Sequence, residues 1–260
     1  MYRVRDMPGQ RSSNYVERVS VMRLRIAYTK VQDARYIAHL DLTRVFERAI
    51  RRAGIIMSYT EGFNQRPKIS FGFALAVGTE GEREYVDIDI QRDMDLGDAL
   101  GRIQEQLPPG IRLLQGRVLT QGAKPLMAVL NAASYRIRIL MALPILPERL
   151  DEAVGDWLAR EHVVYSRFTK KGPTDKDIRP WVKRLEGKVH GDEIIFELEV
   201  EMGNAGSVRP EEVLASLREL EKLPLDLEAI HIRRTGVHVS YQGANSSPLE
   251  NDGYLQLAES

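Results

Sequence analysis

The 260-residue sequence contains no cysteine. This absence excludes disulfide bonds, thiolate nucleophiles, zinc sites with thiolate ligands and iron–sulfur clusters held by cysteines of this chain. The sequence also lacks any run of about 18 apolar residues, the length that a membrane-spanning helix needs. Residues 1–6 lack the apolar segment of a signal peptide, so we expect a cytoplasmic location with no membrane contact.

The sequence has no excess of either charge and few aromatic residues. The 37 Lys and Arg residues balance 37 Asp and Glu residues, and aromatic residues make up 7%. Zero net charge argues against a uniformly basic nucleic-acid binder, but it permits local basic patches. A hydrophobic content of 43% is typical of a globular chain with a sizeable core.

Hydrophobic periodicity predicts an α+β fold made of two similar halves. Residues 22–120 follow the order strand, helix, strand, strand, helix, strand, and residues 134–240 repeat it. This β-α-β-β-α-β order predicts two tandem ferredoxin-like halves with antiparallel sheets. Residues 121–133 would connect them. Residues 1–21 and 241–260 show little apolar periodicity, which favours a flexible N-terminal arm and a flexible C-terminal tail.

Charged residues on the predicted strands support the duplication. The first and third strands of a ferredoxin-like sheet are neighbours, so opposite charges on them are expected to form exposed cross-strand pairs on the helix-free face. Each carboxylate would then have a cation beside it, which favours ion pairs over a metal site. The bases are Arg23, Arg25, Arg136 and Arg138, and the acids are Asp87, Asp89, Glu197, Glu199 and Glu201.

Basic residues concentrate in two equivalent connections. Residues 23–72 contain ten Lys or Arg and four acids, and residues 166–190 contain eight Lys or Arg and three acids. If the halves pack about a pseudo-two-fold axis, both stretches would line one cleft. Cations beside aromatic rings suit looped or single-stranded RNA, through phosphate contact and base stacking. The aromatic residues of this cleft would be Tyr59, Phe63, Phe168 and Trp181.

The first basic stretch contains a helix that we expect to begin after Asp41 as N-cap, with arginines on its polar face. An alternative is that these arginines form only the solvated face of the helix. The next segment, residues 59–68, has the sequence YTEGFNQRPK, and it combines acidic, amide, aromatic and basic side chains between turn-forming residues. Such a loop is typical of a ligand contact.

We predict a set of RNA- or substrate-binding residues from these two segments. Phosphate contacts are expected from Arg44, Arg48, Arg51, Arg66 and Lys68, base stacking from Tyr59 and Phe63, and readout of polar edges from Glu61 and Asn64. An alternative for Glu61 and Asn64 is that they only favour tight turns.

A catalytic role remains an alternative. Metal-independent RNA endonucleases need a histidine or tyrosine as general acid or base and a cation for the phosphate. His39, Tyr59 and Lys68 offer these groups, and Asp41 would orient His39. The simpler interpretation is that His39 hydrogen-bonds the turn before the helix. A third possibility is a protein-docking module that does not bind RNA.

Residues 34–54, ARYIAHLDLTRVFERAIRRAG, and residues 61–71, EGFNQRPKISF, resemble the bacterial radical-SAM-linked protein family. The resemblance covers residues 23–90 and departs at Gln65, where the family commonly has proline. This family is a domain of unknown function encoded beside, or fused to, a radical S-adenosylmethionine protein. The resemblance implies an accessory, substrate-recognition role without catalytic activity of its own. It also implies no cofactor in this chain, since the cluster and S-adenosylmethionine would belong to the partner.

The gene neighbours of that family often encode ribosomal proteins and ribonucleases, which implies tRNA or rRNA as the substrate. A second similarity lies in residues 234–239, RTGVHV, which are similar to the active-site segment of tRNA pseudouridine synthases. The catalytic aspartate expected directly after Thr235 is missing, because Gly236 stands there. This segment therefore does not predict that activity.

Overall fold

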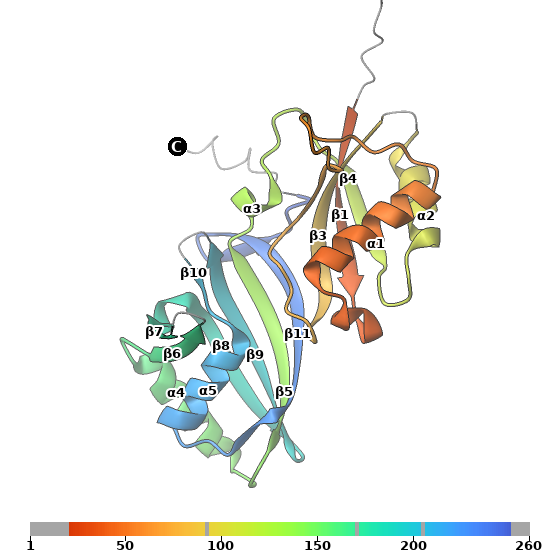
Figure 1. The fold of residues 1–260 in the computed structure, drawn as a ribbon. Coiled ribbons are helices and arrows are strands. Elements are labelled where there is room, and N and C mark those ends of the chain that lie inside the picture. Colours follow the sequence, from red (N-terminus) through yellow and green to blue (C-terminus); the bar gives the residue numbers. More distant parts are fainter. Residues whose placement is uncertain (1–20, 92–93, 170–171, 204–205, 251–260) are drawn as a thin grey trace, which may run out of the picture.

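The computed structural model describes residues 21–91, 94–169, 172–203 and 206–250. In these ranges the chain has a mixed α+β fold, with a large and mostly antiparallel sheet covered by helices (Figure 1). No helix in this part of the chain is long and apolar enough to cross a membrane.

The first half packs two helices on one face of four strands. Its strands lie in the order β4-β1-β3-β2 with antiparallel neighbours. Side chains alternate across this sheet, so Leu24, Ile26, Ile88 and Ile90 face the apolar side of the helices. The elements are β1 (Val21–Lys30), η1 (Gln32–Tyr36), α1 (His39–Arg52), β2 (Ile69–Phe71), β3 (Glu80–Gln91), α2 (Leu96–Gln106) and β4 (Leu113–Val118).

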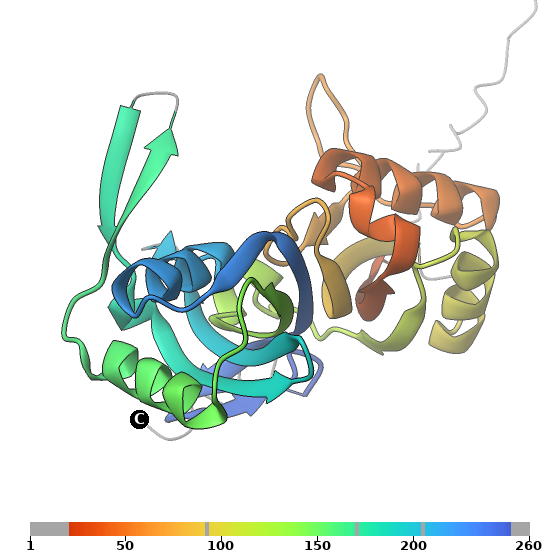
Figure 2. The ribbon, with the colours of Figure 1, turned by 90° about the horizontal axis from the view of Figure 1, so that it is seen from below.

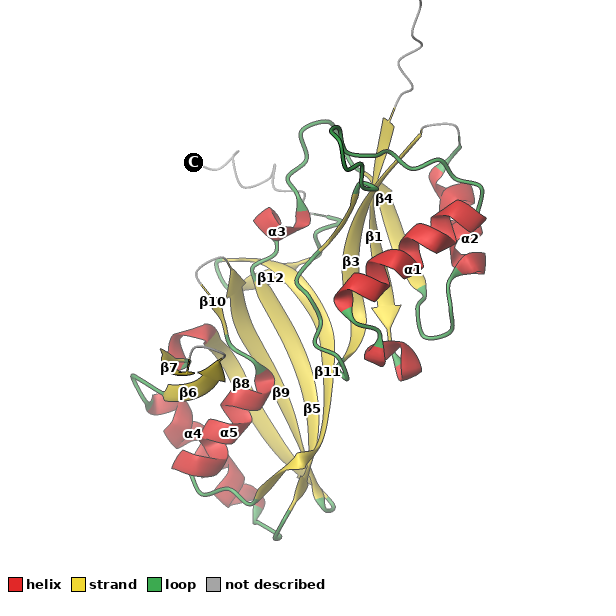
Figure 3. Cartoon of the chain, viewed as in Figure 1, coloured by secondary structure: helices red, strands yellow, loops and turns green. Residues whose placement is uncertain are grey.

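The second half has the strand order β8-β9-β5-β11, again antiparallel, with two long helices on one face (Figure 3). Trp157 is fully buried in its core and donates from Nε1 to Ser216 Oγ at 2.9 Å. The elements are α3 (Leu126–Val129), β5 (Ala132–Met141), α4 (Pro147–Ala159), β6 (Val164–Thr169), β7 (Gly172–Asp177), η2 (Arg179–Trp181), β8 (Val182–His190), β9 (Glu193–Gly203), β10 (Gly206–Ser207), α5 (Pro210–Leu220), β11 (Leu225–Tyr241) and β12 (Ala244–Ser246).

The two halves share one sheet, because β11 pairs in parallel with β3. We call this contact the seam; its residue pairs are Arg233 with Glu80 and Arg234 with Gly81. Buried Arg234 also donates to Glu84 at 2.5 Å and to the Phe73 carbonyl at 2.8 Å. The α+β class and the antiparallel pairing within each half are thus confirmed, while the expected pair of separate sheets is a single sheet of ten strands.

The connector and the tail differ from their predicted boundaries. Residues 121–133 contain α3, and β5 already begins at Ala132. Within the predicted tail, β12 pairs with β11 and Leu249 is buried. Periodicity misses these contacts because β12 is only three residues long and because Pro248 bonds through its backbone carbonyl. Residues 1–20 and 251–260 lie outside the described residues.

Candidate functional site

Residues 58–68, called the loop hairpin below, connect the region after α1 to β2. Backbone hydrogen bonds fix its stem: Lys68 N donates to Ser58 O and Thr60 N donates to Arg66 O, each at 2.8 Å. The Arg66 amide also donates to Thr60 Oγ1 at 3.0 Å. The stem is anchored to β3, since Ser58 N donates to Asp89 O. The sheet therefore holds the hairpin at both of its ends.

The tip of the loop hairpin is exposed and projects from the first half (Figure 2). Gly62 has φ +113°, a conformation that glycine adopts without strain. Phe63 is fully exposed, and Glu61 and Asn64 beside it are exposed as well. Tyr59 lies lower, paired with Pro67, and is 44% exposed. The two residues predicted to stack on bases and the two predicted to read polar edges thus lie together on one small loop.

The predicted helix arginines form one stripe. Helix α1 begins at His39 with Ala38 as N-cap, three residues before the predicted start after Asp41. Asp41 therefore lies in the first turn, where its carboxylate accepts a hydrogen bond from Arg44 at 2.8 Å. Exposed Arg44, Arg48 and Arg51 follow one another at i, i+4 and i+7 along the outer face. The stripe presents cations to solvent over most of the helix.

The cations of the loop hairpin lie on the other side of the sheet from this stripe. Lys68 and Ser70 alternate with Ile69, which packs toward α1. Arg66, Lys68 and Ser70 line a cavity of about 390 Å³ on the helix-free face, together with Arg23 and Asp89. The predicted phosphate-binding set is therefore divided between two faces that meet at the sheet edge formed by β2.

The cross-strand ion pairs form as the charge pattern predicts, with one difference in each half. Arg23 bonds Asp89 at 2.7 Å and Arg25 bonds Asp87 at 2.8 Å, but the second pair is buried and not exposed. The connector and the 247–249 segment cover it, because Arg25 also donates to the carbonyls of Lys124 and Pro248. In the second half, exposed Arg136 bonds Glu197, whereas Arg138 bonds Glu193, an acid that the prediction omitted.

The pairing of these carboxylates bears on metal binding. No group of three or more His, Asp or Glu residues in the described part of the chain is placed to hold a metal ion. On the helix-free face, Asp87, Asp89 and Glu197 instead pair with arginines, and Glu201 pairs with Lys183.

The described contacts of His39 and Asp41 do not support the catalytic alternative. The His39 ring packs edge-on against Phe71, with centroids 5.5 Å apart, and Asp41 bonds Arg44 instead of His39. Within the described residues, no hydrogen bond or ion pair joins His39 to Tyr59 or Lys68. Catalytic roles for these residues stay a prediction.

The second basic stretch is largely used in structural contacts. Arg167 pairs with Glu212, Lys183 bonds Glu201 at 2.6 Å, and the Arg179 guanidinium donates to the Leu158 carbonyl at 2.8 Å. The Lys176 ammonium lies over the Trp181 ring, 4.9 Å from its centroid. The side chain of Phe168 lies outside the described part of the structure.

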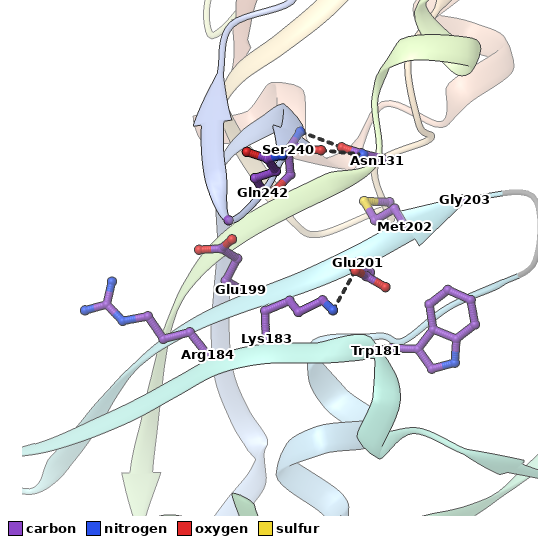
Figure 4. A pocket seen from close by; sticks show the side chains of 11 residues that line it. Asn131, Trp181, Lys183, Arg184, Glu199, Glu201, Met202, Gly203, Ser240 and Gln242 are labelled. Atoms are coloured by element: carbon purple, nitrogen blue, oxygen red, sulfur yellow. Dashed lines mark hydrogen bonds and ion pairs between the residues drawn. The ribbon is translucent and has the colours of Figure 1, made fainter. Parts of the chain in front are cut away.

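Trp181 and Lys183 line a cavity of about 730 Å³ on the second half (Figure 4). Its walls include Glu199, Glu201 and Met202, so acidic and basic groups alternate there. This cavity and the one beside the loop hairpin are separate. The expectation of one shared cleft is therefore wrong, because the halves join edge to edge at the seam and do not face each other.

Sequence reasoning did not identify several residues of the cavity beside the loop hairpin. Ser70 could have been found, because it lies two residues after Lys68 in an extended segment, so both side chains are expected on the same face, and it pairs with Asp87 of β3. Pro125 could not, because it reaches the cavity from the connector through a long-range contact. The charge pattern indicates Arg23 only as a partner of the strand acids.

A family model described as "Uncharacterized protein conserved in bacteria (DUF2344)" matches residues 23–210. This chain belongs to the DUF2344 family. The matched region includes the loop hairpin, α1 and the seam-forming strand β3, and it ends at the start of α5. The description of DUF2344 names no radical S-adenosylmethionine partner, so that partner stays a prediction. Comparison of the chain with curated proteins gives no match.

The DUF2344 chain is distantly similar to several solved structures. A chain of a Cbf5-Nop10-Gar1 complex is 8% identical with a TM-score of 0.47, and the alignment covers 82% of this chain and 49% of that one. A chain of an archaeal box H/ACA sRNP Nop10-Cbf5 complex is 9% identical with a TM-score of 0.40, covering 80% and 46%. An unknown protein from Galdieria sulphuraria is 10% identical with a TM-score of 0.25, covering 83% and 99%. This chain spans about half the length of the first two.

Proposed function

We propose that this DUF2344 protein is an RNA-recognition module, with no catalytic activity of its own, that binds through the loop hairpin and α1. The observation that carries the proposal is the fully exposed Phe63 at a projecting tip, on the same loop as the exposed cations Arg66 and Lys68. An exposed ring near cations provides base stacking and phosphate pairing at one place.

The free cations support the proposal. Arg48, Arg51, Arg66 and Lys68 have no side-chain hydrogen bond or ion pair within the described residues. Their charges are available to phosphates without breaking an internal contact. The chain has zero net charge, so this local concentration would direct an anionic ligand to one part of the surface. Glu61 and Asn64 at the tip provide an acceptor and an amide for base edges.

The role on behalf of a radical S-adenosylmethionine protein is a second part of the proposal. It is supported by the resemblance of residues 23–90 and by the absence of cysteine, which leaves the cluster to the partner chain. The cytoplasm is the location that we propose for both. Co-purification of this protein with the radical enzyme from the same organism, with and without ribonuclease, tests the association.

We also infer that the two halves are ferredoxin-like units of one duplicated fold. The support is their common strand order, in which β4-β1-β3-β2 corresponds to β11-β5-β9-β8. The hairpin of β6 and β7 is an insertion between α4 and β8 in the second unit. Two units at 22–120 and 134–240 agree with this order.

The test is binding of the purified full chain to total tRNA and to rRNA fragments across a salt series. Removal of two phosphate contacts in the double variant Arg66→Ala/Lys68→Ala is expected to reduce the slope of log K against log salt by about 1.4, since each contact to a single strand contributes about 0.7. A matched control is Arg102→Ala/Arg218→Ala, which removes two exposed arginines from α2 and α5.

The proposal fails if the wild type does not bind RNA or if both double variants bind alike. Absence of RNA binding together with stable binding to the radical enzyme would identify the protein-docking alternative. RNA cleavage that is lost in His39→Ala would instead identify the catalytic alternative.

A further inference from the structure

The helix-free face of the first half carries a groove made of two adjoining cavities. One is the cavity of about 390 Å³ beside the loop hairpin, and the other, of about 450 Å³, lies at the ends of β1 and β4. Both are lined by Arg23 and Asp89, so the ion pair of these two residues forms the shared floor. Each volume lies within the range of about 300–1,000 Å³ that is typical of ligand pockets.

Two segments far apart in the sequence form the walls of this groove. The loop hairpin contributes Thr60, Arg66 and Lys68 on one side, and residues 119–125, which run from the end of β4 into the connector, contribute the other. In Figure 1 these segments lie next to each other, beside the upper ends of β1 and β3. This second wall is held in place because Leu119 N donates to Arg23 O at 2.8 Å and Lys124 O accepts from Arg25 at 2.7 Å. Both walls are therefore fixed to the sheet.

The charges around the groove favour an anion. Asp89 is paired with Arg23 and Asp87 with Arg25, so both carboxylates are neutralised by arginines. Arg66 and Lys68 remain without side-chain partners in the described residues and leave the groove with excess positive charge. The Arg23 side chain is 46% exposed, and its guanidinium uses Nε and Nη2 for Asp89, which leaves Nη1 for a further acceptor.

The remaining lining suits flat apolar groups and hydroxyls. Pro67 and Pro125 provide apolar surface beside the loop hairpin, and Val118 and Leu119 provide it at the other end. The hydroxyls of Thr60 and Ser70 can donate to a sugar or a phosphate. A charged bridge between two partly apolar cavities matches the alternation of base, phosphate and base along a nucleic-acid strand.

We infer that the groove binds two consecutive nucleotides of single-stranded RNA, with the phosphate between them over Arg23. This inference rests on the proposed function and specifies a site that the sequence did not indicate. The 3′ or 5′ continuation of the strand would pass over Arg66 and Lys68 at the rim and around the β2 edge toward the α1 stripe. The division of the predicted cations between two faces then follows from the path of one bent strand.

The experiment is photo-crosslinking of the full-length protein to a 12-nucleotide oligouridylate that contains 4-thiouridine, with the crosslinked peptides mapped by mass spectrometry. We expect crosslinks in residues 118–125 and 67–70. A cavity-filling variant, Ser70→Phe on strand β2, is expected to weaken binding by about tenfold, the loss of one stacked base. The matched control Thr174→Phe adds the same ring to exposed strand β7 and is expected to bind like the wild type.

The outcomes separate the groove from the proposed function. Crosslinks confined to α1 and residues 61–64, with Ser70→Phe binding like the wild type, overturn the groove inference and leave the RNA-recognition function standing. A wild type that does not bind the oligonucleotide, tRNA or rRNA overturns both. If Ser70→Phe unfolds at a lower temperature than Thr174→Phe, the wild-type crosslink map alone decides, because it requires no variant.

Discussion

Arg25 on β1 donates from Nε and Nη2 to the two carboxylate oxygens of Asp87 on β3, each at 2.8 Å. The Arg25 side chain has no exposed surface, and its other donors reach carbonyls of the connector and of the 247–249 segment. One arginine thus joins the sheet, the connector and the C-terminal segment of the described chain.

Replacement of Arg25 by alanine should destabilise the protein by about 3–5 kcal/mol, because the buried Asp87 carboxylate loses its partner. Chemical denaturation monitored by circular dichroism measures the change. The control is Arg136→Ala in the second half, where the ion pair with Glu197 is about half exposed and should contribute about 0–1 kcal/mol. Equal losses in the two variants would contradict this prediction.

Replacement of Phe63 by alanine should weaken RNA binding by about 1–3 kcal/mol, the contribution of one stacked base, without changing thermal stability. The side chain is fully exposed, so its removal takes nothing from the core. Fluorescence anisotropy with a labelled oligonucleotide measures the affinity. Leu143→Ala removes another exposed apolar side chain and should have no effect on it. An affinity unchanged in Phe63→Ala would exclude stacking at this position.

The pKa values of two histidines should lie on opposite sides of the ordinary value near 6.5. The hydrogen bond and charge of Asp177 raise the pKa of His162, whereas burial lowers the pKa of His238. The raised pKa means that the His162 contact stabilises the fold at low pH and that its contribution is lost as pH rises through the folded-state pKa. Proton NMR of the two rings across pH 5–8 measures both values. The variant Asp177→Asn should return the pKa of His162 toward the ordinary value. If the pKa of His162 stays raised in this variant, Asp177 is not the cause.

Gly110→Ala should destabilise the protein more than Gly191→Ala does. Both glycines have positive φ, at +85° and +65°, so each substitution imposes backbone strain of about 1–2 kcal/mol. An added Cβ at Gly110 would also collide with the Val31 carbonyl oxygen and approach Ala34, whereas the space around Gly191 is open. The collision should add about 1–3 kcal/mol, as overpacking does. Thermal unfolding of the two variants, compared at one pH, provides the measurement.

Local patterns in the sequence predicted the parts of the fold that depend on local contacts. Alternation placed Arg23 and Asp89 on one face, and opposite charges at those positions predicted their pairing across β1 and β3. The same reasoning could not predict that Arg25 is buried, because what covers it comes from Lys124 and Pro248. Every residue has a backbone carbonyl, so contacts through these groups cannot be predicted from a hydrophobic pattern.

The residues of the candidate site were predictable individually, but their arrangement was not. The amino-acid composition of the loop hairpin is enough to single out Phe63, Arg66 and Lys68. Their separation from the α1 stripe depends on which face of β2 each side chain occupies, and β2 is only three residues long. So short a strand carries too little alternation to fix its faces from the sequence. The seam was also missed, because a parallel contact of two residue pairs has no local signature.

The position of β11 in the chain determines the order in which the molecule can be completed during synthesis. All four strands and both helices of the first half lie between Val21 and Val118, so its core can form while the rest is still being translated. Strand β11 is needed to close the second half and to make the seam, and it is not complete until Tyr241. Its pairing with β3 spans about 150 residues of sequence, the kind of long-range contact that forms slowly. Until then the edge of β3 at Glu80 and Gly81 lacks its strand partner. A nascent chain interrupted before β11 therefore exposes an unpaired strand edge and charged side chains that are buried in the finished protein.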